Sequence, residues 1–190
     1  MARKPDATAR ERILAVATRL FDAHGVHTVG LQQIIDELGC GKNLLYREFA
    51  TKDELVVAYL ERCQHDWTSI VERISEELPG DPAGQLIEIV AVVAEQATRP
   101  GFRGCPVHNT NAEFAVADHP VHRACVGHFD EVRDHLYDLA VRARADDPRT
   151  LADRIALIVD GVNANGAALG ARGASSVARG LADDVVRAAL

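Results

Sequence analysis

The fold is decided by residues 31–49, which read LQQIIDELGCGKNLLYREF. Apolar residues recur at helical spacing on both sides of the glycine-rich break at 39–41. The break separates two short predicted helices, over residues 31–38 and 42–49. A longer amphipathic helix precedes them, with its apolar face running from Ile13 to a stop signal at Gly25. A longer helix followed by two short helices and a glycine-containing turn is the arrangement of a helix-turn-helix.

Helical periodicity continues through the rest of the chain, and no alternating strand pattern occurs. Thr51 and Glu54 form a capping box that opens a long helix. Ser175 or Ser176 is expected to cap the last helix. The expected helices beyond residue 50 are 51–78, 83–98, 104–114, 118–144, 147–170 and 175–190. We therefore predict an all-α protein of about nine helices.

Composition and charge limit the possible classes of protein. Of the 190 residues, 47% are hydrophobic and 26% charged, as in an ordinary globular protein. The net charge is −7, yet residues 1–52 hold 8 basic and 6 acidic residues, so only this part suits a polyanion. No apolar run approaches the roughly 20 residues of a membrane helix. With four cysteines and no export signal, we expect a cytoplasmic protein with reduced thiols and no membrane contact.

The second short helix is the candidate for the DNA major groove. Asn43 can read adenine, and Leu44 can contact a thymine methyl group. Lys42, Tyr46 and Lys52 are suited to phosphate. Backbone N–H groups at the start of the next helix favour the same anion. On periodicity alone, the alternative is a pair of surface helices with a solvated polar face.

Several motifs decide between a DNA-binding helix-turn-helix and a pair of ordinary surface helices. They are FDAHG at 21–25, LQQII at 31–35, LGCGKNLLYREF at 38–49 and KDEL at 52–55. With these motifs, residues 8–56 closely resemble the DNA-binding head of TetR-family (tetracycline-repressor-like) regulators. The resemblance implies an all-α homodimer whose head binds a palindromic operator and whose body binds a small molecule. The positions that it assigns to DNA contact are Gln32, Lys42, Asn43, Leu44, Tyr46 and Lys52. Arg47, on the same polar side, is a further phosphate candidate.

Four positions depart from the family pattern. Gly30 and Gly41 stand where the family usually has Ser or Thr at the starts of the two short helices. Leu44 replaces a residue that is usually small or polar, and Glu48 often has a His counterpart. A carboxylate near phosphates is unfavourable unless it pairs with Arg47 or accepts a hydrogen bond from cytosine.

A polar segment in the second half of the chain is the candidate ligand site. Residues 104–114 read GCPVHNTNAEF and, with DHPV at 118–121, resemble a TetR subgroup pattern in which Gly-Cys precedes an Asn and a Glu four residues later. Asn109 and Glu113 share one helical face. They either line a pocket beside an apolar bundle or satisfy backbone groups at a helix break. The candidate ligand contacts are His108, Asn109, Glu113, Phe114 and Asn163.

Two Cys-x2-His pairs make a metal site possible. They are Cys105 with His108 and Cys125 with His128. Thiolates and imidazoles are the ligands of a Cys2His2 zinc site. A zinc-responsive regulator that uses these four residues is therefore kept as the alternative function, while no cofactor or metal ligand is assigned.

The last two predicted helices carry many small residues together with larger apolar ones, and the family resemblance makes them the homodimer interface. We expect a helix-turn-helix DNA-binding domain at 1–52 and a helical effector-binding and dimerisation domain at 53–190. The implied function is a ligand-responsive transcriptional regulator, a repressor by family default. It would bind an inverted-repeat operator and leave it when a small-molecule effector binds. An enzyme is not expected, because no nucleophile constellation with motif context and no phosphate loop is present.

Overall fold

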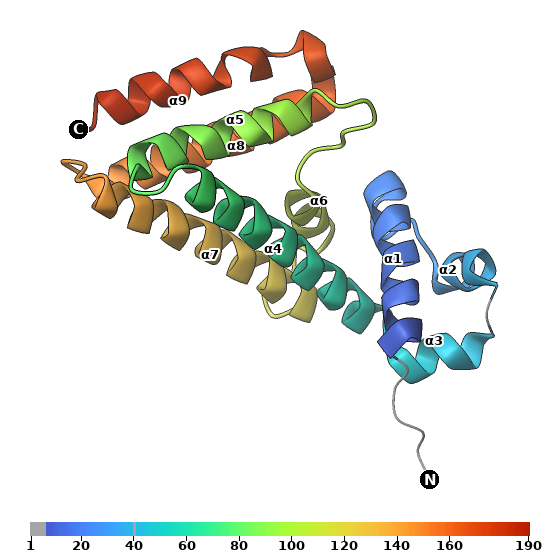
Figure 1. The fold of residues 1–190 in the computed structure, drawn as a ribbon. Helices are drawn as coiled ribbons and strands as arrows, with labels where there is room; N and C mark the ends of the chain where they lie inside the picture. The colour runs from blue at the N-terminus through green and yellow to red at the C-terminus, as the bar shows by residue number, and fades with distance from the viewer. Residues whose placement is uncertain (1–6, 40) are drawn as a thin grey trace. The chain divides into compact units, whose positions relative to one another are not determined.

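The computed structural model describes residues 7–39 and 41–190. These residues form nine α-helices and two short 3-10 turns, with no strand among them (Figure 1). The predicted all-α fold is therefore confirmed. The helices are α1 (Ala7–His24), α2 (Leu31–Leu38), α3 (Lys42–Glu48), α4 (Lys52–Glu77), α5 (Pro82–Ala97), α6 (Pro106–Glu113), α7 (Pro120–Arg142), α8 (Pro148–Leu169) and α9 (Ala178–Arg187).

The helices group into two compact units, which are described separately. Unit 1 contains α1, α2, α3, the first part of α4, α6 and the first part of α7. Unit 2 contains the remainder of α4 and α7 together with α5, α8 and α9. The chain passes between the units after Gln64, Cys105 and Val126. The sequence-based functional boundary at residues 52 and 53 stays a prediction.

In unit 1, α1 packs against both α2 and α3. The apolar faces that the periodicity predicted are the ones that are buried, among them Phe21, Ile34, Leu45 and Phe49. The side chain of Tyr59 on α4 contacts α1 twice. Its hydroxyl donates to Asp22 Oδ1 at 2.5 Å, and its ring meets the edge of the Phe21 ring at 5.4 Å between centroids. These contacts fix the first turns of α4 on the helix-turn-helix.

Glycines precede both α2 and α3, and a glycine also ends α2, whereas α3 ends at Phe49. Gly39 ends α2 in the left-handed conformation, at φ 60°, which glycine adopts without strain. Gly30 and Gly41 precede α2 and α3 with no side-chain cap. Cys40, between the two helices, lies outside the described residues. Neither short helix therefore gains stability from an N-terminal hydroxyl.

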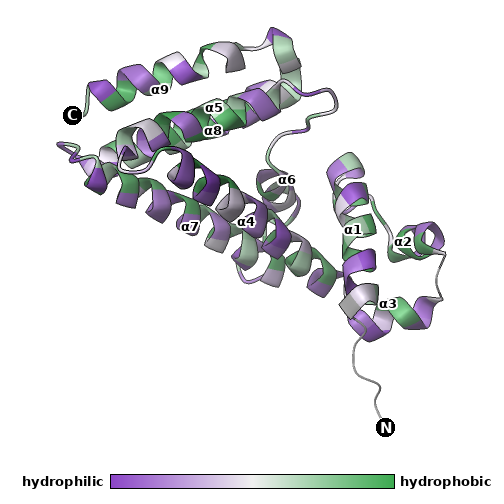
Figure 2. Ribbon diagram, in the orientation of Figure 1, coloured by the Kyte–Doolittle hydropathy of each residue, from purple (hydrophilic) through white to green (hydrophobic). Residues whose placement is uncertain are grey.

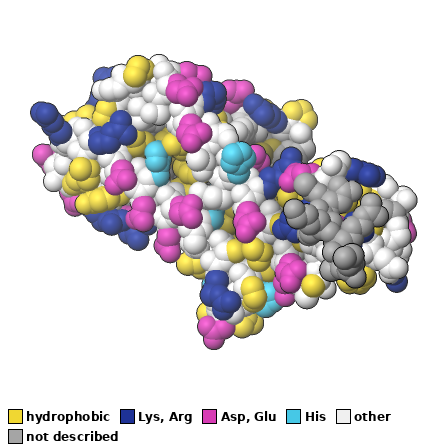
Figure 3. All heavy atoms as spheres, turned by 60° about the horizontal axis from the view of Figure 1, so that its bottom comes forward, with side chains coloured by type: hydrophobic (Ala, Val, Ile, Leu, Met, Phe, Trp, Pro, Cys, Tyr) yellow, Lys and Arg dark blue, Asp and Glu magenta, His cyan; other side chains and the backbone are white. Residues whose placement is uncertain are grey.

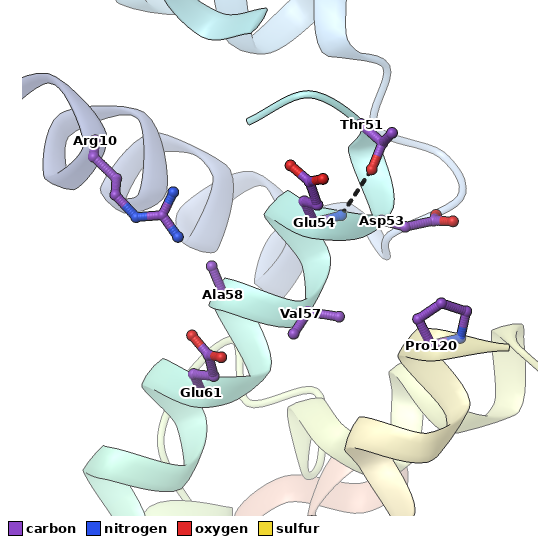
Figure 4. A pocket seen from close by; sticks show the side chains of 8 residues that line it. All are labelled: Arg10, Thr51, Asp53, Glu54, Val57, Ala58, Glu61 and Pro120. Atoms are coloured by element: carbon purple, nitrogen blue, oxygen red, sulfur yellow. Dashed lines mark hydrogen bonds between the residues drawn. The ribbon is translucent and has the colours of Figure 1, made fainter. Parts of the chain in front are cut away.

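The capping box at the start of α4 is present in part. Thr51 Oγ1 accepts from the N–H of Glu54 at 3.1 Å (Figure 4). The Glu54 carboxylate accepts from the N–H of Ala50 at 2.8 Å, one residue before the position that a standard capping box uses. The predicted start of this helix is thus confirmed.

Unit 2 is built around α5, which packs against α8 and α9. Figure 2 shows the hydrophobic character of α5, and its buried residues include Leu86, Ile89, Val90 and Val93. The expected cap of the last helix is wrong. Residues 174–177 form a 3-10 turn instead, Ser175 is buried in it, and α9 begins after Val177 with no side-chain cap.

The contact between α5 and α8 depends on a glycine. A methyl group at Gly166 would lie 2.5 Å from the Cβ of Ala97 and 2.8 Å from its carbonyl oxygen. Because one of these neighbours is backbone, it cannot turn aside as a flexible side chain would. Gly166 therefore lets the two helix backbones approach each other closely.

We expect Gly166→Ala to lower the free energy of unfolding by about 1–3 kcal/mol, since the two helices must separate. Gly127→Ala is the matched control, because a methyl group there, in the interior of α7, meets no atom within 4 Å. The control replaces a helical glycine without a clash and is expected to stabilise by about 0.5–1 kcal/mol. Urea unfolding of both variants measures the difference. Equal effects in the two variants would show that the close approach does not limit stability.

Candidate DNA-binding surface

Helix α3 divides into a buried face and an exposed face. Leu45 is fully buried, whereas Lys42, Asn43, Tyr46 and Arg47 are exposed. The predicted contact residues outside this set are Gln32, exposed on α2, Leu44, half-buried on α3, and Lys52, half-buried at the start of α4. All seven predicted DNA contacts thus lie in unit 1, on α2, α3 and the first residue of α4. The structure leaves the polar face of α3 open to solvent.

Acidic side chains lie in the same elements as the predicted DNA contacts, with Asp36 exposed on α2 and Asp53 half-buried at the start of α4. The face drawn in Figure 3 carries Asp and Glu side chains interspersed with Lys and Arg, consistent with the net charge of −7. Within α2, Gln32 Nε2 donates to Asp36 Oδ1 at 2.7 Å. A DNA ligand would therefore meet individual cations and polar groups rather than a continuous basic stripe.

Glu48, which departs from the family pattern, pairs with Arg47. The Arg47 Nε donates to Glu48 Oε1 at 3.0 Å, and its Nη2 lies 2.9 Å from the same oxygen. The Glu48 side chain is 0% exposed, whereas that of Arg47 is 40% exposed. Of the two sequence-based explanations for Glu48, pairing with Arg47 is confirmed, and the burial of the carboxylate argues against a contact with cytosine, which no observation tests.

Arg10 on α1 holds the end of α3. Its Nη1 donates to the carbonyl oxygen of Glu48 at 2.9 Å, and its guanidinium lies over the Phe49 ring, 4.1 Å from the centroid. A carbonyl at a helix C-terminus that finds such a donor stabilises the last turn. Arg10 therefore supports α3 from behind its exposed face.

Lys52 lies in a mixed electrostatic environment. Burial lowers the pKa of its ammonium group, while the carboxylates of Glu113 and Asp53 act in the opposite direction. Lys52 is the first residue of α4, so its charge adds to the positive end of the helix dipole. The ammonium group and the helix N-terminus would favour an anion such as phosphate at this position, whereas the two carboxylates would oppose it.

Glu113, the last residue of α6, binds the turn that follows α1. Its Oε1 accepts from the N–H of Val26 at 3.0 Å, and its Oε2 accepts from the N–H of His27. The His27 Nδ1 lies 3.5 Å from the same Oε2. The structure thus shows Glu113 satisfying backbone groups, one of the two sequence-based interpretations. Its assignment as a ligand contact stays a prediction, in competition with this role.

Aromatic contacts extend this arrangement toward α4. The Phe114 ring lies between the rings of His27 and His119, at centroid distances of 4.6 and 4.9 Å. The His119 Nε2 lies 3.3 Å from Asp53 Oδ2, and His122 Nδ1 lies 2.9 Å from the carbonyl oxygen of Phe114. The segment after α6 thus joins the α1–α2 turn to the first turn of α4. No sequence signal pointed to His27, and the motifs that contain Asp53 and His119 did not indicate that these two residues meet, because only folding brings such separated residues together.

The other candidate ligand contacts do not share one element. His108 is half-buried and Asn109 exposed, both on α6 in unit 1. Asn163 is half-buried on α8 in unit 2. Asn165, two residues further along the same helix, accepts from the N–H of Ala174 at 2.8 Å. A ligand role for His108, Asn109, Phe114 and Asn163 stays a prediction.

An open groove in unit 1 has a volume of about 480 Å³ (Figure 4). Its lining residues are Arg10, Thr51, Asp53, Glu54, Val57, Ala58, Glu61 and Pro120. None of the predicted ligand contacts is among them. Three of the eight are carboxylates, and the single guanidinium is the one that already binds the end of α3.

The zinc alternative finds no support in the structure. Within the described part of the chain, no three His, Cys, Asp or Glu side chains come close enough to hold a metal ion. Cys105, His108, Cys125 and His128 therefore do not form the four-ligand site that their spacing suggested.

Among the residues that the structure describes, no helix combines the length and the hydropathy needed to cross a bilayer.

Known proteins match both the sequence and the fold. The family model described as "Bacterial regulatory proteins, tetR family" matches residues 13–59. Two helix-turn-helix transcriptional regulators of Bacillus subtilis (strain 168) are similar, the uncharacterised YxaF at 29% identity over 120 residues and LmrA at 31% over 121 residues. Each match covers 62% of this chain. The chain spans 62% and 63% of these two relatives, less than two thirds of either.

The crystal structure of SCO4454, a TetR-family transcriptional regulator from Streptomyces coelicolor, matches over 97% of both chains, with a TM-score of 0.90 and 30% identity. The helix-turn-helix, its exposed α3 face and these relatives define the class of protein, a DNA-binding transcriptional regulator. The chain belongs to the TetR family.

The Arg47–Glu48 pair gives a prediction on stability. We expect Arg47→Ala to lower the free energy of unfolding by about 1–3 kcal/mol, because it removes the guanidinium that faces a buried carboxylate. Adding Glu48→Gln to that variant is expected to restore part of the loss. Arg12→Ala, an exposed arginine on α1, is the control and is expected to change stability little. Thermal unfolding checks the series, and an Arg47→Ala variant that melts like the control would contradict the structural role.

Proposed function

We propose that this protein is a ligand-responsive repressor that binds an inverted-repeat operator as a homodimer. The single observation that carries the proposal is the open polar face of α3, on a helix-turn-helix that belongs to a family of transcriptional regulators. The zinc-responsive alternative is not pursued, since residues 7–39 and 41–190 contain no cluster of side chains that could hold the metal.

In this proposal the contacts divide into base readers and phosphate binders. Asn43 and Leu44 meet base edges in the major groove. Lys42, Tyr46 and Lys52 hold phosphates, supported by Gln32 and by the exposed part of Arg47. Phosphate contacts set the position of α3 on the duplex, and the two base readers supply the sequence preference.

A second copy of the chain is needed because α3 has only seven residues and reads few base pairs. Half-sites about one helical turn of DNA apart, or a multiple of it, would suit two such helices. We assign the dimer contact to α8 and α9, which expose large apolar side chains. These side chains are Leu157, Leu169 and Leu181, with Val177 on the preceding turn and Leu190 at the chain end. Covering this apolar surface favours association.

The effector is proposed to be a small, partly apolar molecule, with His108, Asn109, Glu113, Phe114 and Asn163 as its candidate contacts. Helix α6 belongs to the same unit as the helix-turn-helix, and the chain enters it directly from unit 2. A ligand that shifts α6 would therefore act on the DNA-binding helices. Because coupling between two sites is reciprocal, operator DNA would weaken effector binding by the same factor.

Selection of bound sequences from random double-stranded DNA tests the proposal. We expect an inverted repeat to be enriched by the parent protein. Lys42→Ala and Tyr46→Ala are each expected to lower affinity for that repeat by about tenfold. The Lys42 variant should also lower the slope of log affinity against log salt by about two, because each protomer of the dimer loses one phosphate contact.

Arg62→Ala is the matched control, because Arg62 is an exposed cation on α4 outside the predicted contacts. It is expected to bind like the parent. Circular dichroism checks that each variant keeps its helix content. Enrichment of no sequence, or binding by both α3 variants at parental affinity, would contradict the proposed function.

A further inference from the structure

The turn after α1 has two consecutive backbone donors that bind outside the helix-turn-helix. The N–H of Gly25 still bonds to the carbonyl of Phe21 at 2.8 Å, and Gly25 then leaves the helix at φ +85°. The next two N–H groups, of Val26 and His27, donate to the two oxygens of Glu113. Val26 is only 2% exposed, so its N–H would be costly to leave without an acceptor. One carboxylate satisfies both donors, and such charge-assisted hydrogen bonds are stronger than neutral ones.

The fit of this carboxylate to the turn is close. A methyl group at Gly25 would lie 2.8 Å from Glu113 Oε1, and the positive φ of Gly25 already disfavours any other residue. The carboxylate is therefore seated directly against the backbone of the turn. This turn leads through Gly30 into α2, and α2 packs against α3.

The same carboxylate acts on one cation of the proposed DNA surface. It favours the charged form of Lys52, the phosphate candidate at the start of α4. It also lies near the imidazole of His27. The ring of Phe114, the next residue in the chain, contacts the rings of His27 and His119, and His119 lies close to Asp53 on α4. The end of α6 therefore contacts both segments that flank α2 and α3.

We propose that Glu113 is a positioning residue for DNA binding, whose carboxylate holds the α1–α2 turn through the N–H groups of Val26 and His27. This inference rests on the proposed function, and it names the residue through which α6 controls the helix-turn-helix. Glu113 touches no DNA in this role. It sets the orientation of α2 and α3, and displacement of α6 releases them.

Glu113→Gln tests the proposal, because an amide offers one acceptor oxygen and turns an NH2 group toward the second donor. Removing a negative charge would by itself favour DNA binding. We expect the opposite, a fall in affinity for the selected operator of about tenfold. The slope of log affinity against log salt is expected to stay parental, because no phosphate contact is removed.

Glu77→Gln is the matched control. Glu77 is the last residue of α4, as Glu113 is of α6, and it pairs with Arg73 in its own helix at 3.0 Å. This control removes the same charge and is expected to keep operator affinity at or slightly above the parental value. Parental affinity in Glu113→Gln would overturn the proposal. So would a fall in affinity matched by an equal fall in the unfolding equilibrium, which indicates a purely structural role.

Amide hydrogen exchange separates this inference from the proposed function. Exchange of the Val26 and His27 amides is expected to be about tenfold faster in Glu113→Gln than in the parent, with the amides of α5 unchanged. If the parent selects no operator, the proposed function fails while exchange still tests the hydrogen bonds. Unchanged exchange at both amides would overturn the positioning role, whatever the DNA result.

Discussion

Helices α2 and α3 of the helix-turn-helix are too short to be stable alone, so they depend on contacts with the rest of unit 1. Helix α2 has eight residues and α3 has seven, whereas isolated helices need roughly 12–15 residues to persist in water. Neither gains an N-terminal hydroxyl cap. Their stability must come from tertiary contacts, namely the buried faces on α1, the Arg10 side chain at the end of α3, and the Glu113 carboxylate at the turn before α2.

Because α2 and α3 depend on contacts from other segments, a change in those contacts can change the position of these helices. The contacts that stabilise α2 and α3 do not involve the exposed face of α3. They can therefore change without altering the exposed side chains that are predicted to meet DNA. Those of Glu113 are an example, because its partners are backbone groups of another segment. In unit 2 the corresponding constraint is the close approach of α5 and α8 at Gly166, which makes that contact sensitive to a single methyl group.

Local patterns predicted the helices well, because periodicity, glycine stops and the capping box at Thr51 all act within a few residues. The buried faces of α1, α2 and α3 followed from the same spacing. Glu113 was singled out by its motif, but its partners lie 86 and 87 residues away, and no local rule specifies them. The cap at Ser175 failed because a 3-10 turn buries that residue before α9 begins.

The central claim is that the polar face of α3 meets DNA. Hydrogen–deuterium exchange of the full chain, with and without its selected operator, tests this claim most directly. We expect slower exchange on DNA binding at residues 41–49 and at the first amides of α4, where N–H groups would bond to phosphate. Slower exchange confined to α7, α8 and α9, with residues 41–49 unchanged, would contradict this claim.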